Sequence, residues 1–177
     1  MNTFLEVRSA GPDDRLPLAR MLELYQHELS DIWDQDLDTH GEYGYALDCF
    51  WARDSGGKTH HAFIVLAHGR YAGFALVDEA VKVHPQQRGR WMAQFFILKK
   101  YRQRGIGART AAAVFAALPG RWEVGQMMAN EAAQAFWRQV IGAHGSVSYV
   151  EHRLTEGAWQ GVVQCFDNSP ALSAADA

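Results

Sequence analysis

The chain has 177 residues, a hydrophobic content of 48% and two cysteines, a composition typical of one soluble globular domain with a sizeable core. Its net charge of −3 disfavours a general nucleic-acid binder, and its apolar runs are too short to span a membrane. The N-terminus lacks the apolar stretch of a signal peptide, so we expect a cytoplasmic protein. Neither the two cysteines nor the eight histidines show the spacing of a metal site.

The first half of the chain predicts a strand, a helix and a hairpin. Residues 4–8 favour a strand, and Gly11-Pro12-Asp13-Asp14 predicts a helix start, because Pro suits the first turn and acids stabilise the positive end of the helix dipole. Residues 61–67 and 71–77 predict two strands around a short turn. Apolar side chains recur at helical spacing between these segments, at Leu18, Met21, Leu22, Tyr25 and Leu29.

Charge is unevenly distributed along the chain. The segment from Glu28 to Asp48 holds seven acids and no Lys or Arg, whereas Lys82 to Arg109 holds eight bases and no acid. The basic segment suits a polyanionic ligand and the acidic segment suits a cation, although two solvated faces of opposite sign would give the same pattern.

The second half predicts a buried strand, a basic glycine loop and a helix in succession. Residues 91–98 are apolar on both faces apart from Gln94, which suits a central strand. The loop from Arg102 to Gly107 follows, and a helix over 108–118 ends at Pro119-Gly120.

The C-terminal part predicts one more helix and three strands. Asn130 is a good N-cap for a helix that carries apolar residues at helical spacing. Residues 122–125, 146–154 and 159–166 predict strands. We therefore expect one domain over residues 1–168 and a disordered tail over residues 169–177.

The loop Arg102-Gln103-Arg104-Gly105-Ile106-Gly107 has the features of a pyrophosphate site. The start of a helix offers unpaired N–H groups and the positive end of a dipole, and two glycines let the backbone approach a ligand closely. A dinucleotide fingerprint requires Gly or Ala at its third position, where this chain has Thr110. The remaining pattern, R-x-x-G-x-G, resembles the acetyl-CoA-binding motif of the GCN5-related N-acetyltransferase (GNAT) superfamily.

A second stretch strengthens this resemblance. Asn130-x-x-Ala133-x-x-Phe136-Trp137 is similar to the second family signature, N-x-x-A-x-x-F-Y, and the order of predicted elements matches the family over nearly the whole chain. Within this superfamily, the chain is identified as a member of the bacterial type of acetyltransferase that acts on small molecules. The resemblance implies a single-domain α/β (α+β) fold: a mixed, mostly antiparallel twisted sheet of six to seven strands, flanked by about four helices, with strands four and five splayed.

The resemblance also implies acetyl-CoA as co-substrate, without a metal. The pantetheine arm would pair with the backbone of Phe96, Ile97 and Leu98. The pyrophosphate would lie on backbone N–H groups of Arg104, Gly105, Ile106, Gly107 and Ala108. The expected cofactor site is completed by Arg102, Arg109, Asn130, Phe136 and Trp137.

The groups that would move protons depart from the family pattern. Many relatives use a tyrosine as general acid where this chain has Trp137, whose indole N–H cannot deliver a proton at neutral pH. Either another group protonates the leaving thiolate, or the thiolate leaves unassisted. Tyr149 is the nearest alternative acid by fold position, unless it only packs on its strand. Glu123 is the acid nearest the expected site and a candidate base, unless its role is structural.

The acidic segment falls where the family shapes its acceptor pocket. Glu28 and Asp31 would bind or deprotonate the amine, so we expect a small, cationic amine acceptor such as a polyamine, an aminoglycoside-like amine or a basic peptide end. An acyl-CoA-binding sensor or interaction module without turnover is the alternative, because the tyrosine is missing and Gln94 is no base. No membrane or nucleic-acid partner is expected, and a homodimer remains open.

Overall fold

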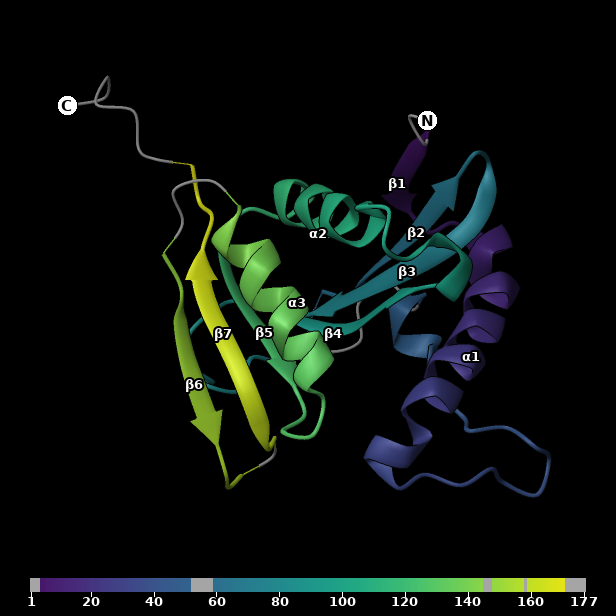
Figure 1. The fold of residues 1–177 in the computed structure, drawn as a ribbon, viewed down its shortest axis with the longest axis horizontal. Helices are drawn as coiled ribbons and strands as arrows, with labels where there is room; N and C mark the ends of the chain where they lie inside the picture. The colour runs from purple at the N-terminus through teal and green to yellow at the C-terminus, as the bar shows by residue number, and fades with distance from the viewer. Residues whose placement is uncertain (1–3, 52–58, 145–147, 158, 171–177) are drawn as a thin grey trace.

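The computed structural model describes residues 4–51, 59–144, 148–157 and 159–170. Within them, seven strands form one sheet in the order β1-β2-β3-β4-β5-β7-β6 (Figure 1). Strands β4 and β5 are parallel neighbours, and every other neighbouring pair is antiparallel. The strands are β1 (Leu5–Ser9), β2 (His61–Ala67), β3 (Arg70–Asp78), β4 (Arg90–Ile97), β5 (Arg121–Gln126), β6 (Val150–Leu154) and β7 (Gly161–Asp167). The predicted fold is thereby confirmed.

Three α-helices cover the two faces of the sheet: α1 (Arg15–Trp33), α2 (Ile106–Ala117) and α3 (Glu131–Gly142). Because successive strand residues point to opposite faces, neighbours in one strand join different cores. Phe63 packs in the core under α2 and α3, whereas Ile64 packs under α1. None of the described helices is long and apolar enough to cross a membrane.

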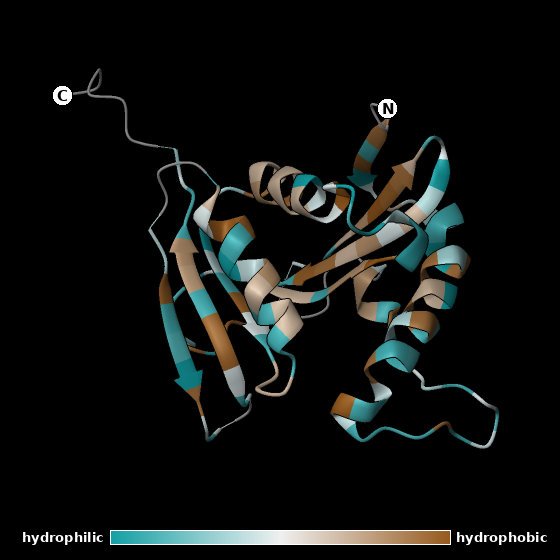
Figure 2. Cartoon of the chain, in the orientation of Figure 1, coloured by the Kyte–Doolittle hydropathy of each residue, from teal (hydrophilic) through white to brown (hydrophobic). Residues whose placement is uncertain are grey.

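The described residues form three α-helices where about four were expected, and the described part of the segment after α1 contains no α-helix. It holds only a 3-10 turn, Asp48–Phe50, and it is largely hydrophilic in Figure 2. Gly41 and Gly44 both adopt positive φ, which interrupts helical geometry. The Glu23 carboxylate on α1 accepts hydrogen bonds from the backbone N–H groups of Tyr43 (2.9 Å) and Gly44 (3.3 Å), and so anchors the returning chain to the helix.

Other element bounds differ slightly from those predicted. Helix α2 begins at Ile106 rather than residue 108, because Gly105 turns the chain in the left-handed conformation directly before it. The strand predicted over 146–154 is described from Val150 onward, and residues 145–147 lie outside the described residues. Most of the predicted tail, residues 171–177, also lies outside them, so its disorder stays a prediction.

A buried carboxylate joins β1 and β3 to the start of α1. Asp14 is 4% exposed in its side chain and accepts hydrogen bonds from Nη1 and Nη2 of Arg8, at 2.6 and 2.9 Å. The N–H of Gly11 (2.7 Å) and the hydroxyl of Tyr71 (3.0 Å) donate to the same carboxylate. The hydrogen bonds from Arg8, with those from Gly11 and Tyr71, lower the pKa of Asp14 to about 2.

We predict that Asp14→Asn lowers the free energy of unfolding by about 2 kcal/mol at pH 7, because the ionised side chain is the form that these donors stabilise. A lowered folded-state pKa contributes stability above the unfolded-state value, and this contribution disappears as the pH falls from about 4 towards about 2. Urea unfolding of the wild type and of Asp14→Asn between pH 7 and pH 3 measures the difference between their free energies of unfolding. The exposed neighbour Asp13, replaced by Asn, is the control. A difference that does not narrow below pH 4 contradicts the assignment.

Candidate active site

The parallel strands β4 and β5 separate soon after they meet. Their pairing is confined to Arg90 with Trp122 and Trp91 with Glu123. The indole of Trp91 occupies the space beside Gly125, where a Cβ would lie only 2.1 Å from a ring carbon. A side chain at position 125 would therefore displace the indole, so only glycine leaves room for it. The indole of Trp91 thus forms a wedge between β4 and β5. Beyond it the two strands diverge towards the ends of α2 and α3 (Figure 1).

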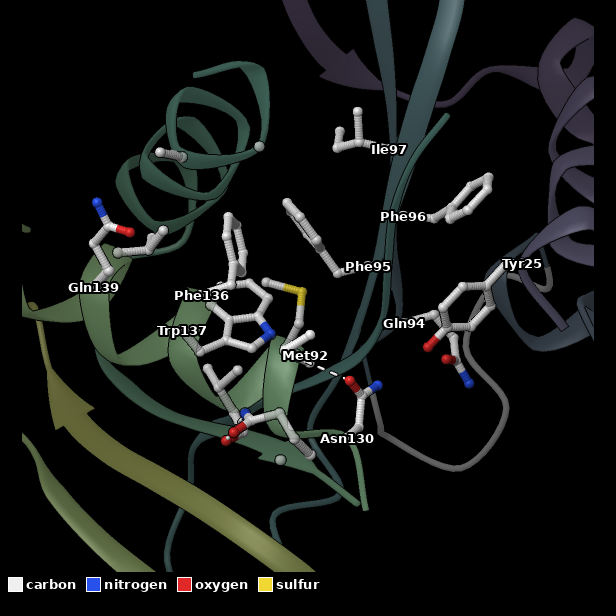
Figure 3. A pocket seen from close by; sticks show the side chains of 18 of the residues that line it. Tyr25, Met92, Gln94, Phe95, Phe96, Ile97, Asn130, Phe136, Trp137 and Gln139 are labelled. Atoms are coloured by element: carbon white, nitrogen blue, oxygen red, sulfur yellow. Dashed lines mark hydrogen bonds between the residues drawn. The ribbon is translucent and has the colours of Figure 1, made fainter. Parts of the chain in front are cut away.

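A cavity of about 930 Å³ opens where the strands diverge. Residues of α1, α2, α3, β4 and β5 all contribute to its wall, and Figure 3 shows the aromatic side chains around it. The wall includes Tyr25, Trp33, Trp91, Phe95, Trp137 and Trp159. This volume and lining suit a small-molecule substrate.

The edge of β4 that faces the cavity is not paired with β5 beyond Trp91. Leu98 donates its N–H to Ala72 on β3 at 2.9 Å, whereas the carbonyl of Ile97 points away from β3 and accepts from Arg102 Nε at 2.6 Å. Because antiparallel pairing alternates, every second residue of β4 turns its backbone groups towards the cavity. The register shift between Leu76 and Val77 also leaves Ala93 as an extra, unpaired residue on β4.

The start of helix α2 is shaped to receive an anion. Its N-cap, Gly105, has φ of 70° and no side chain to cap the helix. The first helical hydrogen bond runs from Arg109 N to Gly105 O at 3.1 Å, so the N–H groups of Ile106, Gly107 and Ala108 have no acceptor within the helix. Gly105, Gly107 and Ala108 line the cavity, so these donors and the positive end of the helix dipole lie at its wall.

Arg102 connects this loop to α1. Its Nη2 lies 2.6 Å from the Glu28 carboxylate, its Nε bonds the Ile97 carbonyl, and its guanidinium lies 5.4 Å from the centre of the Phe96 ring. Glu28 and Arg102 both line the cavity, and no other Asp or Glu does so among the described residues. The ion pair therefore closes one side of the cavity and places one carboxylate in its wall.

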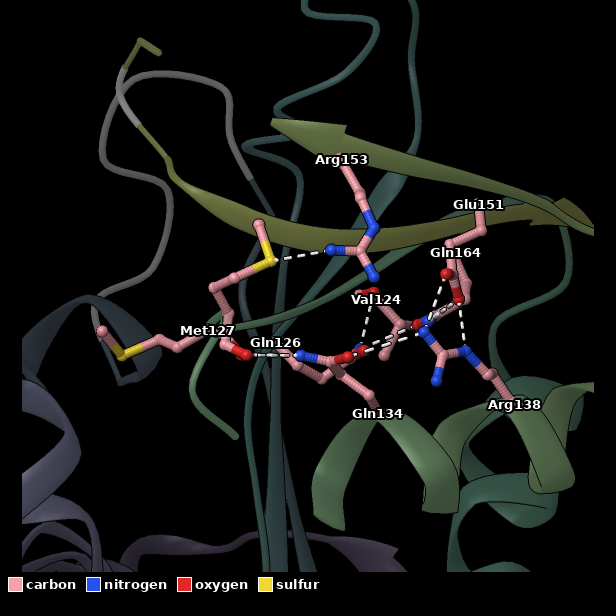
Figure 4. A network of polar contacts seen from close by, with 9 residues as sticks. Val124, Gln126, Met127, Gln134, Arg138, Glu151, Arg153 and Gln164 are labelled. Carbon is pink, nitrogen blue, oxygen red and sulfur yellow. Dashed lines mark hydrogen bonds and ion pairs between the residues drawn. The ribbon is translucent and has the colours of Figure 1, made fainter. Parts of the chain in front are cut away.

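A chain of polar side chains supports the opposite wall (Figure 4). Arg138 binds both carboxylate oxygens of Glu151, at 2.7 and 2.8 Å, and lowers the pKa of Glu151 to about 2. An ionised carboxylate only accepts, so Gln164 turns its NH₂ to Glu151 (2.9 Å) and its oxygen to Nε2 of Gln126 (2.8 Å). This orientation leaves Oε1 of Gln126 without a partner among the described residues, buried just beneath the cavity surface.

Comparisons with known proteins agree with this geometry. The sequence profile of the acetyltransferase (GNAT) family matches residues 18–143. The chain belongs to this acetyltransferase family. Family members use acetyl-CoA as co-substrate, and the uncapped start of α2 and the open edge of β4 suit its pyrophosphate and pantetheine groups. No curated protein matches the chain.

Several solved structures share the fold. An acetyltransferase from Thermus thermophilus is 16% identical, covers 92% of this chain and 95% of its own, and has a TM-score of 0.61. A Salmonella typhimurium structure with its cofactor acetyl-CoA is 16% identical, with coverages of 98% and 99% and a TM-score of 0.61. The ribosomal-protein-S18-alanine N-acetyltransferase of Escherichia coli is 15% identical, with coverages of 97% and 98% and a TM-score of 0.57.

Most of the residues predicted to hold the acetyltransferase cofactor lie around one cavity. Nine line it: Phe96, Ile97, Arg102, Gly105, Gly107, Ala108, Asn130, Phe136 and Trp137. Ile106 is buried beneath the loop, and Leu98 is half-buried at the end of β4. Arg104 and Arg109 are exposed beside the helix start. Asn130 caps α3, since its Oδ1 accepts from Ala133 N at 3.1 Å.

The two residues predicted to act in proton transfer, Glu123 and Tyr149, both lie outside the described cavity wall. Glu123 is 4% exposed and accepts hydrogen bonds from the backbone N–H groups of Lys82, Val83 and His84, at 2.5, 2.9 and 3.0 Å. Tyr149 packs against the core near Gly142. Both side chains make packing or anchoring contacts, and their roles in proton transfer stay predictions.

The two predicted acceptor residues have different environments. Glu28 lines the cavity, but Asp31, one turn further along α1, is exposed and does not. Of the remaining acids in this segment, Asp48 pairs with Arg15, and Asp38 accepts from the N–H groups of His40 and Glu42. The acidic segment therefore continues from the end of α1 into a solvated loop, and of its carboxylates only that of Glu28, on the helix, lines the cavity.

Sequence reasoning did not single out several residues of the wall. Tyr25 was expected only as part of an apolar helix face, yet it also lines the cavity, and burial raises its pKa well above the usual range. Tyr45 hydrogen-bonds Gln94, and burial raises the pKa of its hydroxyl too. Trp159 lies in the wall with an unpartnered indole N–H among the described residues. Aromatic residues at helical or strand spacing look like core, so periodicity alone does not reveal them.

We predict that Ala108→Glu weakens coenzyme A binding at least about tenfold, because a carboxylate at this exposed position competes with phosphate for the start of α2. Isothermal titration calorimetry with coenzyme A measures the affinity. Ala116→Glu makes the same change at an exposed position two turns along the helix and leaves the affinity unchanged. Because an acid near the helix N-terminus stabilises the helix, urea unfolding shows no loss of stability for Ala108→Glu. Equal affinity of the two variants contradicts the assignment.

Proposed function

We propose that this acetyltransferase moves an acetyl group from acetyl-CoA to the primary amine of a small molecule by direct attack. The observation that carries the proposal is the opening between β4 and β5. It has the uncapped start of α2 at one side and the Glu28 carboxylate at another. One cavity thus offers an anion site for the donor and, for an ammonium acceptor, a carboxylate that is paired with Arg102.

The donor half consists of backbone. Acetyl-CoA supplies an activated acyl thioester, and the N–H groups of Ile106, Gly107 and Ala108 would bind its pyrophosphate. Arg104 and Arg109 would add positive charge around the loop. The cavity edge of β4 from Phe96 to Leu98 would pair with the pantetheine amides as a further strand does. Asn130, Phe136 and Trp137 would contact the arm from α3.

The acceptor half is mainly aromatic. Trp33 and Trp91 contribute apolar surface, whereas Glu28 contributes the carboxylate that attracts the ammonium group. The amide oxygen of Gln126, buried without a partner among the described residues, is a second place where an N–H group would be stabilised. A primary amine on an apolar or aromatic body fits this lining better than the polyamine or aminoglycoside that the acidic segment first suggested.

No strong acid faces the leaving thiolate among the described residues of the wall. Burial raises the pKa of Tyr25, so its hydroxyl stays protonated and donates a hydrogen bond without transferring the proton to a less basic thiolate. The indole of Trp137 is limited in the same way. We therefore propose that the thiolate leaves unassisted, and that the proton of the amine passes to solvent at the Glu28 side.

We also infer a cytoplasmic enzyme, because Cys49 and Cys165 are both free thiols, as is usual in a reducing compartment. A homodimer remains a prediction.

Thiol release on addition of amines tests the activity. We expect release with phenethylamine to exceed release with spermidine, and phenylalanine to react poorly because its carboxylate meets the charge of Glu28. Turnover of phenylalanine without turnover of phenethylamine contradicts the acceptor assignment. Coenzyme A binding with no release across a broad amine panel would instead favour the non-catalytic sensor.

Glu28→Gln is predicted to lower kcat/KM for the amine about tenfold and to change the KM for acetyl-CoA less, because Glu28 would meet the amine directly and the donor only through Arg102. Steady-state kinetics with each substrate varied in turn separates the two effects. Asp31→Asn removes a carboxylate from the same helix one turn away and is the matched control. An equal loss of kcat/KM in the two variants would indicate a general electrostatic effect of the acidic segment and would contradict a direct role of Glu28.

A further inference from the structure

Two histidines and a cysteine meet on the part of the sheet formed by β5, β7 and β6. His84 lies between β3 and β4, His152 on β6 and Cys165 on β7. Their ligand atoms all lie within 4.8 Å of one another, and the two imidazole rings are 5.9 Å apart and nearly perpendicular. The three residues are far apart in the sequence, which is why spacing did not indicate a metal site.

Strand register explains why His152 and Cys165 face the same way. On β6 and β7, Val150 lies opposite Cys165 and His152 lies opposite Val163. Residues directly opposite each other share a face, as do residues two apart in one strand, so His152 and Cys165 are diagonal neighbours on one face. The adjacent Phe166 packs in the core with α2 and α3, so these two side chains point to the opposite face.

Glu123 places the third side chain, that of His84, on the same face of the sheet. Glu123 lies opposite Cys165 in the pairing of β5 with β7, and so it points to the same face. Its carboxylate accepts three backbone N–H groups of residues 82–84, which fixes this segment over the strands. His84 is thus held beside His152 and Cys165 by a buried carboxylate that has no access to the cavity.

We propose that His84, His152 and Cys165 bind one zinc ion, or a divalent ion of similar preference, at a site separate from the acetyl-transfer cavity. Imidazole nitrogen and thiolate sulfur are the ligands that zinc prefers, and three protein ligands leave a fourth position for water. Tetrahedral coordination at Zn–N and Zn–S bond lengths places ligand atoms about 3.5 Å apart. His84 is exposed and the other two are half-buried, so small side-chain rotations close the site and the ion enters from solvent.

Metal binding must displace a proton from the thiol. Burial and the nearby Glu123 charge raise the pKa of Cys165 to about 12, so the side chain is an S–H group before the ion arrives. The metal–sulfur bond forms as the S–H bond breaks, and the proton leaves to solvent. Each histidine would bind the ion through one imidazole nitrogen.

The ion would fasten the segment before β4 to the far edge of the sheet. The Nζ atom of Lys82, in this segment, lies 5.5 Å from the ring centre of Trp91, whose indole forms the wedge between β4 and β5. A bound metal would therefore stiffen the chain that supports one wall of the substrate cavity without contacting either substrate.

Titration of the chelator-treated, full-length protein with Co²⁺ and Zn²⁺ tests the site. We expect one equivalent of Co²⁺ to give visible bands of tetrahedral cobalt and a sulfur-to-cobalt charge-transfer band in the near ultraviolet, and Zn²⁺ to displace it and raise Tm. Cys165→Ser abolishes the charge-transfer band, and His152→Ala weakens binding at least about tenfold. Cys49→Ser and His40→Ala, at positions away from the cluster, leave the titration unchanged.

His84→Ala provides a variant whose folding is not at risk, because this side chain is exposed. It should also weaken Co²⁺ binding at least about tenfold. The proposal is overturned if the charge-transfer band is absent from the wild-type protein. It is equally overturned if Co²⁺ affinity is the same in His84→Ala as in the wild type.

Discussion

The candidate site depends on the wedge that Trp91 makes between β4 and β5. Its indole uses the space that a side chain at Gly125 would fill, and the parallel pairing ends there after two residue pairs. Beyond the wedge, the backbone groups of β4 that point away from β3 face a cavity instead of a strand, and one of them, the Ile97 carbonyl, accepts from Arg102. Backbone donors and acceptors require partners when they are buried. The opening is therefore suited to an extended ligand that carries amides, and the starts of α2 and α3 lie beside it.

The donor half was predictable because its chemistry is local in sequence. The strand, the loop from Arg102 to Gly107 and the helix follow one another directly, and the anion site consists of backbone at their junction. Asn130 was likewise recognisable as a cap, since capping depends on residues three positions apart. The pairing of Arg102 with Glu28 was not predictable, because these residues are 74 positions apart and come together only when α1 packs on the sheet.

The acceptor half and the far edge of the sheet depend on register. Glu123 is an acid near the expected site in sequence, yet its face of β5 points away from the cavity and towards the segment before β4. The same register brings His152 and Cys165 together and orients the amides of Gln164 and Gln126. A shift of one residue in one of these strands would turn its side chains to the opposite face. Composition and the spacing of polar residues do not show which side chains of different strands become neighbours.

Arg102 contacts both the donor side and the acceptor side of the candidate site. Its side chain contacts the Ile97 carbonyl on the donor edge and the Glu28 carboxylate on the acceptor wall. In the proposed mode of binding, a ligand that changes either contact would change the other, so the binding free energies of donor and acceptor would be linked through one guanidinium. Such linkage would be reciprocal: whatever factor acetyl-CoA applied to the affinity for the acceptor, the acceptor would apply to the affinity for acetyl-CoA. The arginine of the phosphate loop would therefore couple the two halves of the candidate site.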